Sequence, residues 1–388
     1  MDFATATCSS NRHHHVLAPT VRRAVFHACG DLDDGFVGHD LAGKRVLARR
    51  LAALLGYDFA EEGQRLDANE ARLYVVPSDT LTAAQARQLG VQGPQDLFGG
   101  VVPYAFVATK AITHPLVAPG AAAPRGWSVA FPNEVRKVVL PGYTAFTAHD
   151  AREAGERLLR MHGSVRLKET TGVGGLGQCV VDDGAELARR IGAMAPEVLA
   201  QQGLVLEHNL ARLVTYSVGQ VRVGPHTASY HGTQCLTRNR HGQEVYGGSS
   251  LVIVRGGFDE LLALPLDSEV RGAVKNAMVY HQAAQRCFRG FFASRANYDV
   301  VAGADEAGRP QAGVLEQSWR IGGASGAEIA ALEAFQADAS LRCLRASTHE
   351  IHGESGSPPP AALVYFDGID ERIGRLCKYA MVRPHDDA

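Results

Sequence analysis

The sequence predicts an α/β protein that is built from several packed α+β subdomains. Its 388 residues exceed the length of one ordinary domain. Apolar residues make up 46% of the chain and charged residues 21%, which is a globular composition. Short β-rich runs alternate with helical runs over residues 22–208, which predicts small open sheets with helices on their faces. Residues 213–255 contain β-rich runs without a helical run, so a further sheet is expected there.

The N-terminal part predicts a flexible leader over residues 1–20 and a small Rossmann-like α/β domain over residues 21–104. Apolar residues recur at helical spacing within Asp40–Leu55, and Gly56 follows them as a stop signal. The other elements expected in this domain are strands at Ala24–Ala28 and Ala71–Val76 and a second helix at Thr82–Leu89.

The next part of the chain predicts a connector and a second α/β subdomain. Residues 105–136 form the connector, since Pro, Ala and Gly are frequent in them. Residues 137–208 return to alternating strands and helices. The expected strands are Tyr143–Thr147, Val165–Lys168, Gln178–Val181 and Leu204–Glu207, and the expected helices are His149–Met161 and Ala185–Met194.

Residues 209–345 predict a central subdomain. Its first strands lie within 213–255 and precede a helix over Glu269–Gly290. A turn at residues 305–308 then joins two strands into a hairpin, Asn297–Val301 and Gly313–Gln317. A helix is expected over Ile329–Leu344. A Ser/Pro-rich run follows, so residues 346–388 are interpreted as a linker and a tail, with Ala362–Phe366 as a candidate added strand.

Charge and composition exclude several classes of function. Lys plus Arg is 39 and Asp plus Glu is 41, so the net charge of −2 gives no general attraction to nucleic acid or to an anionic membrane. No apolar run reaches the roughly 18 residues of a membrane-spanning helix, and the N-terminus lacks a secretory signal. The seven cysteines are scattered without a Cys-x-x-Cys pair. We therefore expect a cytoplasmic protein without nucleic-acid or membrane partners; a homodimer remains open.

The glycine-rich run at residues 172–177 fits the pattern G-x-G-x-x-G, with glycines at Gly172, Gly174, Gly175 and Gly177. A dinucleotide site requires a helix directly after such a loop, whereas Gln178–Val181 predicts a strand. A loop between two strands can instead close its backbone N–H groups over phosphate oxygens. Lys168 at the end of the preceding strand could reach the same phosphates. The sequence therefore favours a phosphate lid over a nicotinamide site or a plain turn.

A second phosphate motif is considered at Gly38–Arg45, which nearly fits G-x-x-x-x-G-K-[ST]. Arg45 stands where Ser or Thr must hold Mg²⁺, so the motif fails at its metal ligand. Lys44 is therefore expected within an ordinary helix.

The predicted hairpin carries a carboxylate on each strand, Asp299 and Glu316. Successive side chains of a strand alternate between its faces, so these two can share one face of adjacent strands. Two carboxylates beside a phosphate site suit Mg²⁺. Arg320 follows four residues after Glu316 and could hold a carboxylate or a phosphoryl group. The alternative is a solvated strand face with a surface ion pair.

In their order and rough spacing, these pieces resemble the ATP-grasp superfamily over residues 105–325. Lys110 resembles the family's first lysine, and Lys168 with the glycine loop resembles its second lysine and lid. Residues 204–210 are similar to the hinge that binds adenine. Asp299 and the run from Glu316 to Arg320 resemble the metal and anchor end, with Ser318 in place of the usual Asn.

The resemblance implies an ATP-grasp fold preceded by a small Rossmann-like domain, with ATP and Mg²⁺ as cofactors. It implies a ligase that activates a carboxylate as an acyl phosphate for attack by an amine, so the partners are small-molecule substrates. Glu207, His208 and Leu210 would contact the nucleotide, Asp299, Glu316 and Ser318 would hold metal, and Arg320 and Lys168 would be catalytic. The rival hypotheses are an ATP-binding regulator with little turnover and an NAD(P)-dependent oxidoreductase that uses residues 172–177.

Overall fold

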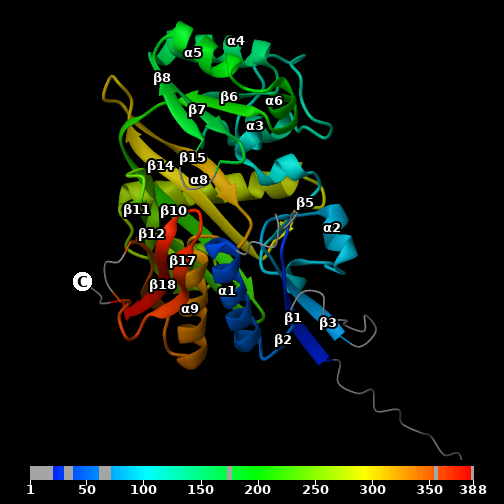
Figure 1. Cartoon of the computed structure of the whole chain (residues 1–388), viewed down its shortest axis with the longest axis vertical. Helices are drawn as coiled ribbons and strands as arrows, with labels where there is room; N and C mark the ends of the chain where they lie inside the picture. The colour runs from blue at the N-terminus through cyan, green and yellow to red at the C-terminus, as the bar shows by residue number, and fades with distance from the viewer. Residues whose placement is uncertain (1–20, 30–37, 61–70, 173–176, 354–356, 386–388) are drawn as a thin grey trace, which may run out of the picture.

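The computed structural model describes residues 21–29, 38–60, 71–172, 177–353 and 357–385. Its elements form four sheets (Figure 1). The N-terminal sheet is parallel and has the strand order β2-β1-β3. These strands are β1 (Val21–His27), β2 (Asp58–Ala60) and β3 (Ala71–Pro77). A parallel sheet with its crossover helix is the Rossmann-like pattern expected from the sequence.

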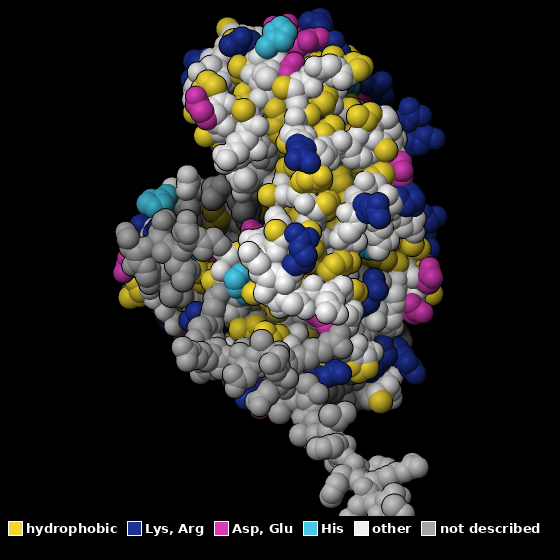
Figure 2. All heavy atoms as spheres, turned by 90° about the vertical axis from the view of Figure 1, so that its right-hand side faces the viewer, with side chains coloured by type: hydrophobic (Ala, Val, Ile, Leu, Met, Phe, Trp, Pro, Cys, Tyr) yellow, Lys and Arg dark blue, Asp and Glu magenta, His cyan; other side chains and the backbone are white. Residues whose placement is uncertain are grey.

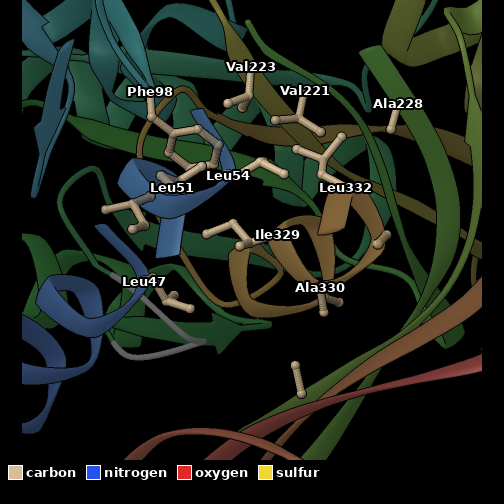
Figure 3. Packing of buried hydrophobic residues seen from close by; sticks show 14 of the residues in the cluster. Leu47, Leu51, Leu54, Phe98, Val221, Val223, Ala228, Ile329, Ala330 and Leu332 are labelled. Atoms are coloured by element: carbon tan, nitrogen blue, oxygen red, sulfur yellow. The ribbon is translucent and has the colours of Figure 1, made fainter. Parts of the chain in front are cut away.

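Helix α1 (His39–Leu55) connects the first two strands. It ends at Gly56, whose φ of 67° is the left-handed conformation that glycine adopts without strain. Leu47, Leu51 and Leu54 recur at helical spacing and are buried. In Figure 3 they face Ile329 and Leu332 from the other side of the same cluster. The predicted helix is therefore confirmed, and its apolar stripe holds the N-terminal domain against the rest of the protein.

Short elements connect this domain to the second sheet region. They include β4 (Leu81–Thr82), α2 (Ala83–Gln88), β5 (Gly100–Val102), α3 (Ala130–Val135) and the 3₁₀ helices η2 (Pro94–Asp96), η3 (Ala105–Ala108) and η4 (Lys110–Thr113). Strand β5 pairs with β4 and with β13 (Phe292–Ala293), so it joins the N-terminal and central parts of the chain.

A four-stranded antiparallel sheet forms the upper lobe in Figure 1. Its order is β6-β9-β7-β8, with β6 (Gly142–Ala145), β7 (Val165–Glu169), β8 (Gln178–Val181) and β9 (Leu204–His208). Helices α4 (Ala148–His162), α5 (Gly184–Gly192) and α6 (Pro196–Gln202) belong to the same lobe and share its core. The Thr147 hydroxyl caps α4 by accepting a hydrogen bond from the Asp150 N–H at 3.1 Å.

The largest sheet has eight antiparallel strands in the order β15-β14-β10-β11-β12-β16-β18-β17. Its first five strands in chain order are β10 (Ala211–Val223), β11 (His226–Arg238), β12 (Glu244–Arg255), β14 (Arg295–Ala304) and β15 (Pro310–Ser318). Helices α7 (Phe258–Leu262), α8 (Ser268–Cys287) and α9 (Ser325–Ala337) complete this part. Val218 and Val221 of β10 have opposite parity and belong to different core clusters, so α8 and α9 cover opposite faces of the sheet.

The prediction of a linker and a tail over residues 346–388 is wrong for the part of it that the structure describes. Strands β16 (Cys343–His352), β17 (Leu363–Asp370) and β18 (Gly374–Pro384) extend the large sheet. The Ser/Pro-rich run lies between β16 and β17, because Pro and Ser mark turns within a sheet as well as domain boundaries. The candidate strand at Ala362–Phe366 overlaps β17, which begins at Leu363. The helix expected over Ile329–Leu344 is α9, which ends at Ala337.

Figure 2 shows a notch in the surface between the upper lobe and the body of the protein. None of the helices in the described ranges is both long and apolar enough to cross a membrane.

Candidate functional site

The two predicted metal ligands are direct neighbours on the hairpin of β14 and β15. Asp299 and Glu316 are paired across the two strands, so their side chains leave the same face. The Asp299 carboxylate accepts hydrogen bonds from Gln234 at 2.8 Å and from Asn297 at 3.0 Å. Burial, and next the charge of Glu316, raise the pKa of Asp299 to about 6.

This pair of carboxylates fits a divalent cation, because a cation beside them would relieve their repulsion. No group of three or more His, Cys, Asp or Glu residues that could hold a metal occurs within the described ranges. Mg²⁺ commonly binds through one or two carboxylates and completes its shell with phosphates and water. Asp299 and Glu316 are therefore suited to a metal that arrives with a nucleotide.

Lys110 connects β15 to the start of the glycine loop. Strand β15 is called the metal strand below, because it carries the predicted metal ligand Glu316. Its Nζ lies 2.6 Å from Glu316 Oε2 and donates to the Gly172 carbonyl at 2.9 Å. Lys110 begins η4 and is itself buried. The Gln317 amide holds this segment against β15 by donating to the Thr109 carbonyl at 2.8 Å. The ammonium is thus fixed between the metal strand and the loop.

Lys168 lies on β7 and forms a buried ion pair with Glu207 on the neighbouring strand β9. The His114 ring contributes a second contact, with Nε2 3.2 Å from Glu207 Oε2. Burial alone would raise the pKa of Glu207, but Lys168 and His114 lower it to about 2. Glu207 is therefore ionised and holds the second lysine in place.

The predicted adenine hinge, residues 204–210, is held by a backbone hydrogen bond and by the packing of two of its side chains. The His208 N–H donates to the Pro141 carbonyl at 2.8 Å, and the buried His208 ring stacks on His162 with 4.0 Å between the ring centroids. Leu210 is buried in a small cluster with Leu140. The side chains of His208 and Leu210 thus pack within the protein at the predicted hinge.

Of the predicted lid glycines, Gly172 and Gly177 are described, and both make backbone hydrogen bonds to Glu169. Gly177 has a φ of 71°. Gly174 and Gly175 lie outside the described residues. Directly after the loop, residues 178–181 form strand β8, whereas the dinucleotide hypothesis requires a helix near Gly177. The alternative of a nicotinamide site at this loop is therefore wrong.

Ser318 ends β15 and Arg320 follows it by two residues, and a buried arginine fixes both. Arg295 donates to the Ser318 hydroxyl at 3.2 Å and to the Arg320 carbonyl at 2.7 Å. Its guanidinium also pairs with the fully buried Glu328 of α9 at 2.7 Å. The Arg320 side chain points toward the N-terminal domain, where its Nε lies 3.7 Å from Asp79 Oδ1.

Several of these supporting residues escape sequence reasoning. Arg295 and Asn297 lie four and two residues before Asp299 on the same strand, so continuing the alternation from Asp299 would have placed them on its face. His114 and Glu328 carry no local signal, because their partners are distant in the sequence.

A cavity of about 510 Å³ lies elsewhere, between the N-terminal sheet and the turn after β10. Arg22, Tyr57, Tyr74 and His226 are among its lining residues. It shares no residue with the site described above.

Solved structures with a similar fold are N5-carboxyaminoimidazole ribonucleotide synthetases. An ADP complex of purK matches at 14% identity, with a TM-score of 0.50 over 94% of this chain and 93% of that chain. The enzyme from Staphylococcus aureus matches at 10% identity, with the same TM-score and the same shares of each chain. The Aspergillus clavatus enzyme, in complex with ADP and 5-aminoimidazole ribonucleotide, matches at 13% identity, with a TM-score of 0.50 over 94% of each chain. No curated protein matches the sequence.

The expected fold is therefore confirmed: the chain has the ATP-grasp fold, preceded by a small parallel α/β domain. The family described as "Protein of unknown function (DUF3182)" matches residues 30–380, and the chain belongs to this family.

Proposed function

We propose that this protein is an ATP-dependent ligase that activates a carboxylate as an acyl phosphate for attack by an amine. The nucleotide would lie between the four-stranded sheet and the β14–β15 hairpin. The observation that carries the proposal is the contact of Lys110 with both Glu316 and the Gly172 carbonyl. It brings the first lysine, the metal strand and the start of the lid to one point.

The ion pairs at this point suit an exchange of partners. Lys110 and Glu316 compensate one another in the protein without a nucleotide. When Mg²⁺ and ATP bind together, Glu316 and Asp299 would hold the metal and Lys110 would hold the phosphates. Each buried charge then keeps a partner, which avoids the cost of leaving one uncompensated. Bound Mg²⁺ would supply neutralisation of phosphate charge.

The residues of this chain would mainly position charge, as in other phosphoryl transfers. A substrate carboxylate oxygen attacks the γ-phosphorus, the bond to the β–γ bridging oxygen breaks, and ADP leaves. The amine then adds to the acyl carbon, phosphate leaves with the electrons of the broken C–O bond, and the amine proton passes to solvent. Lys168 would stabilise the phosphates, and Arg320 would hold the carboxylate at the end of the metal strand.

Ser318 motivates the alternative of an ATP-binding regulator with little turnover. Its hydroxyl already accepts a hydrogen bond from Arg295, so it is a weaker metal ligand than a free amide oxygen. This alternative predicts ATP binding without phosphate release under any set of substrates.

Calorimetry with Mg-ATP tests the proposal on the wild type, on Lys168→Ala and on Lys275→Ala. Lys275 is an exposed lysine of α8 and serves as the matched control. Loss of a lysine–phosphate contact is expected to weaken binding roughly tenfold or more, from about 1.5–3 kcal/mol for a charged hydrogen bond. Equal affinity of Lys168→Ala and the wild type would overturn the assignment of the second lysine. NADH, as a further titrant, is expected to give no heat.

A further inference from the structure

The lysines of this chain are few and unusually placed. The sequence has six lysines, at positions 44, 110, 137, 168, 275 and 378, against 33 arginines. Four of the six are buried, whereas Lys137 and Lys275 are exposed. Lysine is rarely buried without a partner, because its charge loses hydration. Lys110 and Lys168 belong to the proposed nucleotide site, and Lys44 and Lys378 lie outside it.

Lys44 and Lys378 are part of a charged cluster that also contains Arg320, Asp40, Asp79 and Glu350. Lys44 Nζ lies 2.6 Å from Asp40 Oδ2 and donates to the Ser78 carbonyl at 3.0 Å. Lys378 Nζ lies 3.0 Å from Glu350 Oε1. The third pair, between Arg320 and Asp79, is longer at 3.7 Å.

Contacts between distant segments hold the three pairs together. The first N–H of α1, at His39, donates to Asp370 at the end of β17 at 2.8 Å, which fixes the start of the helix against the C-terminal strands. Partial burial would raise the pKa of Asp40, but Lys44, Lys378 and Arg320 lower it. Asp40 is thus within the electric field of all three cations.

The cluster adjoins the place where the transferred phosphoryl group would lie. Arg320 follows Ser318, the last residue of β15, by two positions, and Arg295 ties both backbone carbonyls to the sheet. A substrate held by Arg320 would therefore lie next to the proposed metal site.

The charges of the cluster balance, and two of its three carboxylates are exposed. Three cations stand against three carboxylates, so the formal charges cancel. The side chains of Asp40 and Asp79 are 59% and 63% exposed, whereas those of Lys44 and Arg320 are 10% and 23% exposed. A ligand that approaches from solvent thus meets Asp40 and Asp79 before Lys44 and Arg320.

This arrangement discriminates between ligands of different charge. A purely anionic ligand at Arg320 would be repelled by the adjacent carboxylate of Asp79. A purely cationic ligand at Asp79 would be repelled by Arg320 in the same way. A ligand with one carboxylate and one ammonium group can insert into the long pair and compensate both charges.

On this basis, and resting on the proposed function, we propose that the activated carboxylate belongs to an amino acid. Arg320 binds the carboxylate beside the γ-phosphoryl group, and Asp79 with Asp40 binds the ammonium group. Lys44 and Lys378 hold Asp40 and Glu350 in place through their ion pairs. The carboxylate of this amino acid is the group that attacks the γ-phosphorus in the step written above.

The test captures the acyl phosphate with hydroxylamine. Wild-type protein with Mg-ATP and hydroxylamine is given the proteinogenic amino acids and β-alanine, their N-acetyl derivatives and their amides. Hydroxylamine attacks the acyl carbon and releases phosphate, which leaves a hydroxamate that is measured by its iron complex. Free amino acids are expected to form hydroxamate, N-acetyl derivatives to be at least roughly tenfold poorer in kcat/KM, and amides to be inactive.

Variants assign the effect to the cluster. Asp79→Asn is expected to raise KM for the free amino acid roughly tenfold while leaving that for the N-acetyl derivative unchanged. Asp259→Asn, at an exposed position of α7, is the control and is expected to change neither. Equal use of free and N-acetylated amino acids, or activity with bicarbonate or simple carboxylic acids alone, would overturn the inference.

Binding gives a second readout that does not depend on turnover. Amino acids are titrated by calorimetry into protein that is saturated with Mg²⁺ and a non-hydrolysable ATP analogue. Absence of heat from every amino acid overturns the inference even though the nucleotide binds. Absence of nucleotide binding overturns the proposed function instead, and titration of the nucleotide-free protein with amino acids then still decides whether the cluster binds them.

Discussion

Replacing Glu328 by Gln should destabilise the protein strongly, because it leaves Arg295 buried without a charged partner. The Arg295 and Glu328 side chains are 2% and 0% exposed, and the guanidinium makes three hydrogen bonds of 2.7–3.1 Å to the carboxylate. The Tyr230 hydroxyl donates a further hydrogen bond to the Glu328 carboxylate at 2.5 Å. Breaking a buried pair from one side costs about 3–5 kcal/mol. The assay is urea unfolding followed by tryptophan fluorescence.

A more exposed pair on the same helix, α9, provides the control. Arg50 of α1 and Glu333 of α9 lie 2.6 Å apart but are 43% and 25% exposed. Glu333→Gln should therefore cost at most about 1 kcal/mol. If Glu328→Gln lowered the free energy of unfolding by no more than Glu333→Gln, the reasoning from burial would be refuted.

A double variant separates stability from positioning. Arg295→Met with Glu328→Leu removes both charges and replaces them with apolar groups, which is often neutral for stability. It also removes the donors to the Ser318 and Arg320 carbonyls. We expect the free energy of unfolding to recover while the rate of ADP formation stays low. Recovery of both would show that Arg295 acts only through stability.

Three further predictions follow from single features of the structure. Because the pKa of Asp299 is raised to about 6, a metal that binds below that pH must displace the proton of this carboxyl group. The affinity for Mg-ATP should therefore rise with pH up to about 6 and then level off. Calorimetry from pH 5 to 8 should show this rise in the wild type, and the rise should be absent in Asp299→Asn. A methyl group at Gly313 would lie 2.7 Å from the backbone of Val139 and Leu140, so Gly313→Ala should lower the free energy of unfolding by about 1–3 kcal/mol. A methyl group at Gly272 in α8 would meet no atom within 4 Å, so Gly272→Ala should raise the free energy of unfolding by about 0.5–1 kcal/mol. His114→Ala removes one partner of Glu207 but leaves Lys168, so it should weaken Mg-ATP less than Lys168→Ala, and a larger effect would contradict the assigned order of importance.

Local patterns determine much of this fold. The apolar spacing and the stop at Gly56 predict α1 to within one residue at its start, because both signals lie within the helix itself. The turn signal at residues 305–308 predicts the hairpin of β14 and β15, although an irregularity between Asp299 and Val300, which the sequence does not indicate, is what sets Asp299 opposite Glu316. These predictions need only residues that are near one another in the sequence.

The remaining features depend on contacts between distant segments. Strands β16 and β18 pair across a long connection, and no local pattern shows which strand they join. Asp40 and Arg320 are far apart in the chain, but in the folded protein the charge of Arg320 helps to lower the pKa of Asp40. The scarcity of lysine is visible in the sequence, but only the structure shows that four of the six are buried.

The central claim is that ATP binds between the four-stranded sheet and the β14–β15 hairpin. A crystal structure of the protein with Mg²⁺ and a non-hydrolysable ATP analogue tests it most directly. The account predicts triphosphate oxygens within hydrogen-bond distance of Lys110 and Lys168 and a metal bound to Asp299 and Glu316. A nucleotide bound elsewhere, such as in the cavity lined by Arg22 and Tyr57, would contradict it.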